Sequence, residues 1–363
     1  MTHKVRDPSR FRGSVSASLL TSSAHLEGVS RDNRLKYIAG LRYKTNRYLL
    51  GTLDTRASYI PSYYDMQTLV TYSLNEKARI SLFGTANINS YTFIPRSRKS
   101  SFGNLAEAYQ LFVYYEGSEK DQYSSYNLAL TLELSPDPGF SSKFFLHGYT
   151  TDESETFDIR GTYSLNLLDK DIGSENLGDS IMNIGSGSWL DHARNKFNAS
   201  ILTLGYKSRW EHTDNVLSWG LKFKLENIDD SFREWRKIDS AGFSIPVSGS
   251  DLLLSRFAAS SHSLNTRRTE AYIIDNYTIT PGGHSLVFTG GVRLTYWSLN
   301  GEVIVSPRFS VYWQPPVASL TLYTAFGTYY QPPLLQGDEE ARRVNQQGDQ
   351  ITEVETHCCG VCL

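Results

Sequence analysis

The stretch that decides the fold is Tyr126-Asn127-Leu128-Ala129-Leu130-Thr131-Leu132-Glu133-Leu134-Ser135. Its leucines fall at every second position, and polar or small residues stand between them. Successive side chains of a β-strand point to opposite faces of a sheet, so this period of two predicts a strand with one apolar and one polar face. An amphipathic helix would instead repeat its apolar residues every three to four positions.

The same alternation recurs in three other long runs, at 219–226, 284–297 and 301–313. Weaker runs lie near 12–28, 35–44, 66–74, 78–90, 107–117, 142–150, 156–167, 197–210, 269–279 and 319–330. Together they predict about fourteen strands, and no long stretch has helical periodicity. The fold class is therefore all-β and antiparallel.

Composition excludes several classes of protein. Of the 363 residues, 13% are aromatic, 40% are hydrophobic and 20% are charged, which excludes intrinsic disorder. No stretch approaches the roughly 20 apolar residues of a membrane-spanning helix. The 36 basic and 38 acidic residues leave a net charge of −2, so nothing in the charge balance points to a nucleic-acid partner.

Two all-β architectures fit these strands. Many runs have about 9–13 residues, as a tilted membrane-spanning strand requires, whereas globular strands usually have about 5–6. The mid-strand charges Lys222, Lys224, Glu226, Arg293 and Arg308 would face solvent in a sandwich or a watery lumen in a barrel. Aromatic rings near strand ends favour a barrel, which carries aromatic girdles at both membrane boundaries. The candidate girdle residues are Tyr114, Trp210, Trp219, Trp297, Trp313 and Tyr329.

Connection lengths support a barrel with two unlike ends. Short turns are expected near 30–33, 75–77, 136–139, 212–215, 280–284 and 315–318, and long connections near 45–62, 168–196 and 227–268. Short and long connections alternate from residue 197 onward. Before that the alternation slips around 89–123 and again around 168–196, which predicts a missed or misplaced strand in each region.

The two ends of the chain do not follow the strand pattern. The first 13 residues contain no apolar segment of a secretory signal. The residues from about 336 onward are polar and irregular, offer no closing strand, and are expected to be an off-pattern tail. Since the last strand of a barrel must pair with the first, the pattern predicts part of a larger barrel. All three cysteines, Cys358, Cys359 and Cys362, lie in this tail without a second ligand pair for zinc, so no metal site is expected.

Short motifs along residues 3–335 resemble the barrel of TonB-dependent outer-membrane receptors of Gram-negative bacteria. The motifs, in chain order, are Val5-Arg6-Asp7, Phe11-Arg12-Gly13, His25-Leu26-Glu27-Gly28, Arg42-Tyr43-Lys44, Pro61-Ser62-Tyr63-Tyr64-Asp65, Leu74-Asn75-Glu76-Lys77, Glu155-Thr156-Phe157-Asp158-Ile159, His192-Ala193-Arg194-Asn195, Asp239-Ser240-Ala241-Gly242, Ser306-Pro307-Arg308 and Tyr329-Tyr330-Gln331-Pro332-Pro333. Each is short, and their number and order carry the resemblance.

The resemblance implies an incomplete transmembrane barrel, about 14 of roughly 22 strands, occluded by a plug in the whole protein. It divides the chain into the end of the plug and a linker (1–10), the N-terminal part of the barrel (11–335) and the tail (336–363). It implies outer-membrane lipid and the inner-membrane TonB energy-coupling complex as partners of the full-length protein. This chain departs from the family pattern by lacking the signal, the TonB box, most of the plug and the closing third of the barrel.

No enzymatic motif stands out. HExxH, P-loop and nucleophile-elbow patterns are absent, so neither catalytic residues nor a cofactor are expected. The acidic run Asp152-Glu153-Ser154-Glu155 with Asp158 has the hard oxygen ligands of a Ca²⁺ site, but a solvated acidic loop is the favoured interpretation. The basic run Arg96-Ser97-Arg98-Lys99 could contact anionic lipopolysaccharide or an anionic ligand, but a plain exposed loop is again the favoured interpretation.

The leading hypothesis is a fragment of a receptor that binds and imports a scarce nutrient, such as a metal chelate, a vitamin or an oligosaccharide, without covalent catalysis. The alternatives are an unplugged porin or adhesin-like barrel and a secreted all-β binding module. Because long loops on a rigid scaffold tend to carry recognition, we expect the small-molecule ligand to contact loops 89–106 and 227–268. The candidate ligand-binding residues are Arg96, Arg98, Arg233, Glu234, Trp235, Arg236 and Asp239.

Overall fold

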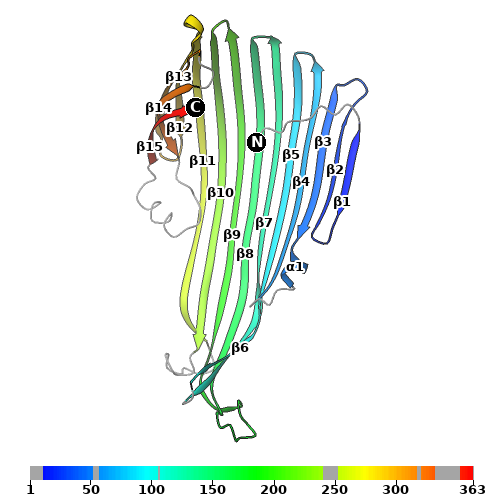
Figure 1. The fold of residues 1–363 in the computed structure, drawn as a ribbon, viewed down its shortest axis with the longest axis vertical. Coiled ribbons are helices and arrows are strands. Elements are labelled where there is room, and N and C mark those ends of the chain that lie inside the picture. Colours follow the sequence, from blue (N-terminus) through cyan, green and yellow to red (C-terminus); the bar gives the residue numbers. More distant parts are fainter. Residues whose placement is uncertain are drawn as a thin grey trace.

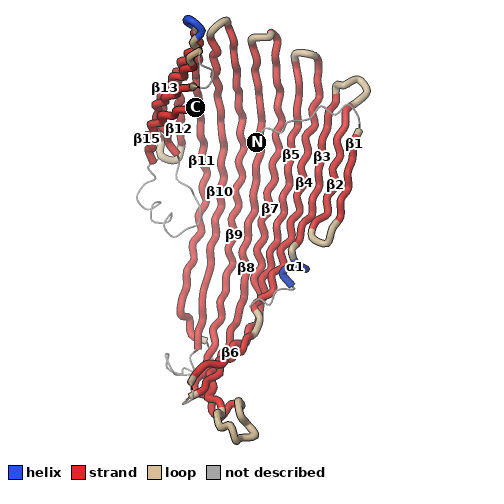
Figure 2. Tube along the Cα trace, in the orientation of Figure 1, coloured by secondary structure: helices blue, strands red, loops and turns tan. Residues whose placement is uncertain are grey.

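A computed structural model describes residues 11–51, 57–104, 107–239, 252–316, 320–331 and 352–362. The described residues form one antiparallel sheet (Figure 1), and the tube in Figure 2 is almost entirely strand. None of the helices in these ranges is long and apolar enough to cross a bilayer. Residues 1–10, expected to be the end of a plug and a linker, lie outside the described residues.

The sheet contains fifteen strands in almost unbroken chain order. The strands are β1 (Arg12–Ala17), β2 (Thr21–Val29), β3 (Leu35–Thr45), β4 (Ala57–Asn75), β5 (Ala78–Pro95), β6 (Arg98–Gly103), β7 (Ala108–Asp137), β8 (Phe140–Leu168), β9 (Ser180–His212), β10 (Asn215–Asp239), β11 (Leu253–Ile279), β12 (Ser285–Trp297), β13 (Glu302–Gln314), β14 (Thr321–Gln331) and β15 (Thr352–Cys362). A short helix, α1 (Arg47–Gly51), follows β3, and a 3₁₀ turn, η1 (Pro281–Gly283), follows β11. Each strand pairs with the next, except that β5 pairs with β7 and the short β6 pairs only with β7.

The expected all-β, antiparallel fold is confirmed, and the choice between barrel and sandwich is settled. A sandwich would bury its leucine rows against a second sheet. The described part of the chain contains a single sheet, which is open, with β1 at one edge and β15 at the other. This arrangement is that of an incomplete barrel.

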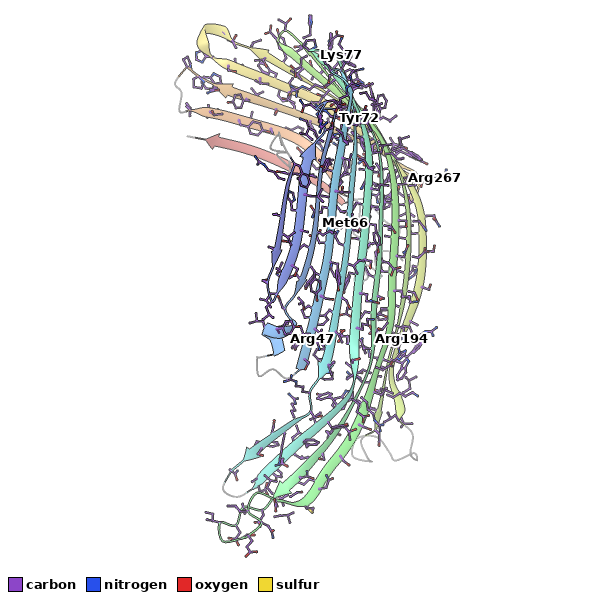
Figure 3. All side chains as sticks on the ribbon, turned by 90° about the vertical axis from the view of Figure 1, so that its right-hand side faces the viewer. Arg47, Met66, Tyr72, Lys77, Arg194 and Arg267 are labelled. Carbon is purple, nitrogen blue, oxygen red and sulfur yellow. The ribbon has the colours of Figure 1, made fainter. Side chains whose placement is uncertain are left out.

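The sheet is curved, and its two faces differ in exposure. Seen edge-on in Figure 3, the strands bow to one side, and β12–β15 turn back toward the side on which β1 lies. On the inner, concave face many side chains are buried, among them Ala193, Thr203 and Glu226. The outer, convex face carries many exposed apolar side chains, because neighbouring side chains diverge on the outside of a curved sheet.

The exposed apolar side chains form a continuous band on the convex face, at the end of the strands that is joined by short turns. This apolar band comprises Leu82, Leu128, Leu130, Phe144, Leu146, Leu202, Leu204, Leu221, Phe223, Leu225, Ile273, Leu294, Val305 and Phe309. A patch of this size on a soluble protein would be an aggregation hazard, whereas on a barrel it is the surface that meets lipid.

Five central strands extend far beyond the apolar band. Strands β7 to β11 have 30, 29, 33, 25 and 27 residues, against about 9–11 for crossing a bilayer. Beyond the band the convex face turns polar, for example at Ser200, Asn198 and Lys196 on β9. We call this part of β7–β11 the polar extension; it runs toward the lower end of Figure 1.

Several strand boundaries predicted from the sequence differ from the observed ones. The runs 107–117 and 126–134 are one strand, β7, and the runs 142–150 and 156–167 are one strand, β8. Conversely, 12–28 contains two strands, β1 and β2. Hydrophobic periodicity reveals a strand only where one face is apolar, so it disappears where both faces of a strand contact water.

The loss of hydrophobic periodicity where both faces contact water also explains why the predicted long connections were too long. Of the segments assigned to loops, β9 occupies 180–196, and β10 and β11 occupy 227–239 and 253–268. With these strands in place, short and longer connections alternate from β2 to β11, whereas the connections between β11 and β14 are all short. The slips of alternation around 89–123 and 168–196 disappear, and the two ends of the sheet differ as predicted.

The last strand, β15, was not predicted from the sequence. β15 pairs antiparallel with β14, with Thr321 opposite Cys362 and Gln331 opposite Thr352. The absence of a strand after residue 336 was therefore a wrong prediction for 352–362. Residues 336–351 lie outside the described residues, and the assignment of 336–363 as a separate tail stays a prediction.

We predict that a charge in the apolar band destabilises the protein in a bilayer. Leu204, at 58% exposure, lies in the middle of the band on β9. Leu204→Arg is expected to lower the free energy of unfolding by about 2–4 kcal/mol, because the guanidinium would enter the hydrocarbon. Urea unfolding of the protein in phospholipid vesicles measures the loss. Asn198→Arg, on the convex face of the same strand but in the polar extension, is the control; equal losses in the two variants would contradict the placement of the band.

Candidate ligand-binding site

The concave face behind the apolar band carries charges that are paired between or along strands. Lys143 Nζ lies 2.9 Å from Glu133 Oε1, and Lys222 Nζ lies 2.6 Å from Glu270 Oε1. The other charges singled out from the sequence, Lys224, Glu226, Arg293 and Arg308, lie on the same face. Charges are costly in lipid but compatible with a wet lumen, so the two faces have opposite environments.

One group of these charges is buried. Lys224 Nζ lies 3.2 Å and Arg268 Nε lies 3.0 Å from the Glu226 carboxylate, and the Arg268 guanidinium stacks 4.4 Å from the centre of the Trp297 ring. The Arg268 Nε–H makes no hydrogen bond with Glu226 despite this distance, so their contact is an ion pair alone. The group ties β10, β11 and β12 together at the boundary between the band and the polar extension.

A pocket of about 250 Å³ lies on the concave side of the polar extension. Its lining residues on the concave face are Glu119, Phe157, Ile159, Asp191, Glu234, Arg236 and Arg256. Ala193, which is fully buried, stands between Phe157 and Glu234 in one cross-strand row. We call this the concave pocket.

An arginine forms the polar wall of the concave pocket. Arg236 donates to both oxygens of Asp191 on the neighbouring strand, at 2.5 and 2.9 Å. Arg256 lies opposite Arg236 on β11. A bidentate arginine–carboxylate pair holds the guanidinium in a fixed plane, and two adjacent arginines offer further donors to an anionic group of a ligand.

Three carboxylates approach one another beside the pocket. Glu119, Asp121 and Glu155 each offer an oxygen within 4.8 Å of the others, close enough to hold a cation. Asn195 Nδ2 donates to Glu155 at 3.0 Å and to Glu234 at 2.9 Å, which links the three to the pocket wall. Burial, followed by the charges of its neighbours, raises the pKa of Glu119, and the pKa of Asp121 is raised by burial and by Glu155.

The candidate ligand-binding residues between 233 and 239 lie in a strand, β10, and not in a loop. Arg233, Glu234, Trp235, Arg236 and Asp239 all lie within β10, so their assignment to a loop was wrong. Strand alternation separates them. Glu234 and Arg236 face the concave pocket, whereas Arg233, Trp235 and Asp239 lie on the convex face. Trp235 also contributes to the lining of the pocket from the convex side, so three of the five candidates, Glu234, Trp235 and Arg236, meet there.

On the convex face, Trp235 belongs to a second polar group. Its ring stacks on His192 at 4.5 Å, and His192 Nδ1 lies 2.6 Å from Asp158, which also pairs with Arg194. Figure 3 labels Arg194 far along the strands from the turn that holds Lys77. His192 thus lies in a network of ring stacking and hydrogen bonds on the water-exposed outside of the extension.

The acidic run at 152–158 is also strand and not loop. It lies in β8, and alternation places Glu153 and Glu155 on the concave face and Asp152 and Asp158 on the convex face. These carboxylates therefore cannot share one Ca²⁺ site. Glu155 instead meets Glu119 and Asp121 from β7, which the sequence did not identify because they lie more than thirty positions earlier in the chain.

The basic run at 96–99 does not reach the concave pocket. Arg96, between β5 and β6, donates to Ser58 Oγ at 3.1 Å, and Arg98 is an exposed residue of β6 opposite Val113. Neither lines the pocket. A ligand contact through these two arginines stays a prediction.

Three of the six candidate girdle residues lie at the edge of the apolar band, and the other three do not. Trp210, Trp219 and Trp313 lie on the convex face at the short-turn edge of the apolar band, and their role as a girdle stays a prediction. Trp297, at 1% exposure, and Tyr329, stacked under Arg308, lie on the concave face and cannot contact lipid. Tyr114 lies on the convex face of the polar extension, well beyond the band. The last three assignments were therefore wrong.

A curved antiparallel sheet with a lipid-facing apolar band outside and ion-paired charges inside is the wall of an outer-membrane β-barrel. A family model described as "TonB dependent receptor-like, beta-barrel" matches residues 76–349. The chain belongs to this family of outer-membrane receptors and transporters, as the resemblance implied. No curated protein sequence matches the chain.

Solved structures of outer-membrane transporters are similar at low identity. The RagAB peptide transporter has 8% identity and a TM-score of 0.45, over 94% of this chain and 40% of that chain. The toluene transporter TbuX of Ralstonia pickettii has 11% identity and a TM-score of 0.29, over 88% and 82%. The ferripyoverdine receptor of Pseudomonas aeruginosa, bound to ferripyoverdine, has 8% identity and a TM-score of 0.20, over 98% and 65%. This chain thus spans less than half the length of the RagAB chain, and the similarities indicate no ligand.

We predict that Glu119→Gln stabilises the protein at pH 8. The raised pKa of Glu119 means that its carboxylate opposes folding above the folded-state pKa, and this effect fades as the pH falls below the unfolded value of about 4.3. Urea midpoints in detergent should therefore be higher for the variant at pH 8 and converge near pH 4. The control is Glu133→Gln on the same strand, which loses its pairing with Lys143 and should not be stabilised. A pH-independent difference for Glu119→Gln would contradict the prediction.

Proposed function

We propose that this chain forms part of the wall of an outer-membrane receptor that binds a scarce nutrient at the concave pocket and imports it through the barrel. The observation that carries the proposal is the position of the pocket on the concave face of the polar extension, beyond the apolar band. Short turns face the periplasm in outer-membrane barrels, so the polar extension projects outside the cell. A ligand would meet the pocket before it reaches the lumen.

The lining of the pocket suits a charged or highly polar small molecule. Arg236, held by Asp191, and Arg256 supply donors, Glu119 and Glu234 supply acceptors, and Phe157 supplies an apolar surface. Metal chelates, vitamins and oligosaccharides all offer groups for such a site. We propose the TonB energy-coupling complex of the inner membrane as the partner of the full-length protein, on the strength of its family.

The proposed location predicts how the protein fractionates. The chain fused to a bacterial export signal should be recovered with the outer membrane and require detergent for extraction, because the apolar band needs lipid. Density-gradient fractionation of producing cells, with immunoblotting, measures this. A soluble, monodisperse protein in the periplasm would favour the secreted binding module and contradict the proposal.

Because successive side chains of β10 lie on opposite faces, substitutions of Arg236 and Arg233 form a matched pair that tests the pocket. We expect Arg236→Ala to weaken ligand binding about tenfold, since it removes the guanidinium N–H donors that Asp191 does not use and leaves the Asp191 carboxylate unpaired in the pocket. Arg233→Ala, on the opposite face of the same strand, should leave binding unchanged. Isothermal titration with ferric citrate, cyanocobalamin and maltohexaose, one probe for each nutrient class, identifies the bound class and then measures both variants. If a probe binds and the two variants lose affinity equally, the concave pocket is not the site.

A further inference from the structure

A groove of about 1030 Å³ crosses the convex face where the apolar band meets the polar extension. One cross-strand row runs along it from β5 to β11 and contains Gly84, Leu128, Gly148, Leu202, Leu225 and Arg267. Figure 3 labels Met66 and Arg267, which lie toward the two ends of the groove. None of the proposed nutrient-binding residues lines it.

The groove exists because two glycines interrupt the outer layer of side chains. Gly84 and Gly148 are the direct cross-strand neighbours of Leu128 on its two sides. A Cβ at Gly148 would meet nothing within 4 Å, so the space above this residue is open. Next to it, the hydroxyls of Thr150 and Ser200 bond to each other at 3.1 Å, which leaves a floor of low polarity.

The chemistry of the groove changes along its length. Leu202 and Leu225 continue the apolar band, and the next residue in the row is Arg267. Its neighbours are Leu225, Asn265, Thr269 and Ser298, none of them acidic. No side-chain partner for its guanidinium occurs among the described residues. One end of the groove is thus a hydrocarbon surface, and the other offers an unneutralised cation beside the amides of Asn227 and Asn265.

From this arrangement we infer that the groove binds an anionic membrane lipid, with an acyl chain over Gly148, Leu202 and Leu225 and the phosphate on Arg267. The inference rests on the proposed placement of the apolar band in the outer membrane. Charge complementarity supports it, because a guanidinium binds phosphate through paired N–H donors, and basic pockets at membrane surfaces select anionic head groups. The position of the groove supports the inference too, since the groove adjoins the apolar band, which contacts the acyl chains of the bilayer.

The test is native mass spectrometry of the full chain released from detergent micelles, after it has been recovered from the outer-membrane fraction. The probe is palmitoyl-oleoyl phosphatidylglycerol, compared with phosphatidylcholine of the same chains and with inorganic phosphate. We expect one retained phosphatidylglycerol, several-fold less phosphatidylcholine and no retained phosphate. Gly148→Phe fills the groove and should reduce the retained lipid at least tenfold. Gly290→Phe is the control, because Gly290 also has open space on the convex face, on β12 outside the groove.

The head-group contact is tested separately. Arg267→Ala should abolish the preference for phosphatidylglycerol over phosphatidylcholine, and Arg267→Lys should retain it. Equal retention by Gly148→Phe and Gly290→Phe would overturn the groove as the site, and an unchanged preference in Arg267→Ala would overturn the role of the phosphate. A protein dimer lost in Gly148→Phe would assign the groove to a second copy instead and overturn the inference. Failure to reach the outer membrane would refute the proposed function and the inference together. A wild-type protein that reaches the outer membrane but retains no phosphatidylglycerol would refute only the inference.

Discussion

The structure depends on the ladder of backbone hydrogen bonds between antiparallel strands. Lipid offers no partner to a backbone N–H or C=O, so a strand that crosses a membrane must bond to neighbours on both sides. The same ladder fixes which side chains stand opposite each other, and it links the strands from β1 to β15 with a few register shifts toward the strand ends. Both faces of the wall, and every site on them, follow from that register.

Because alternation continues beyond the membrane, one strand serves two environments. On β9, Leu202 and Leu204 lie in the apolar band, whereas Asp191 and Asn195 contribute to polar sites on the concave face of the extension. The strands pair antiparallel in both parts. Only the solvent around the convex face changes, from lipid to water, and the side chains of that face change with it. A continuous strand can thus hold a binding pocket rigidly at a distance from the bilayer.

The polar extension also shows how much of the site was predictable. Glu234 and Arg236 were identified from the sequence, but as loop residues. Asp191, which fixes Arg236, lies 45 positions away and was missed, because nothing local marks either residue as the other's partner. Glu119 and Arg256 were missed for the same reason. Strand pairing brings these residues together, and its signal in the sequence is weak wherever both faces are polar.

The sequence by itself determined the fold class, the family and the face on which each residue of the apolar band lies. Alternation is a local property of extended backbone, so Leu128 and Leu130 had to share a face in any sheet. Tertiary structure alone decided which face is convex, where strands end, and that Trp297 lies under Arg268 on the inside while Trp210 lies outside. Those outcomes depend on register and curvature, which arise from bonds between strands distant in the chain.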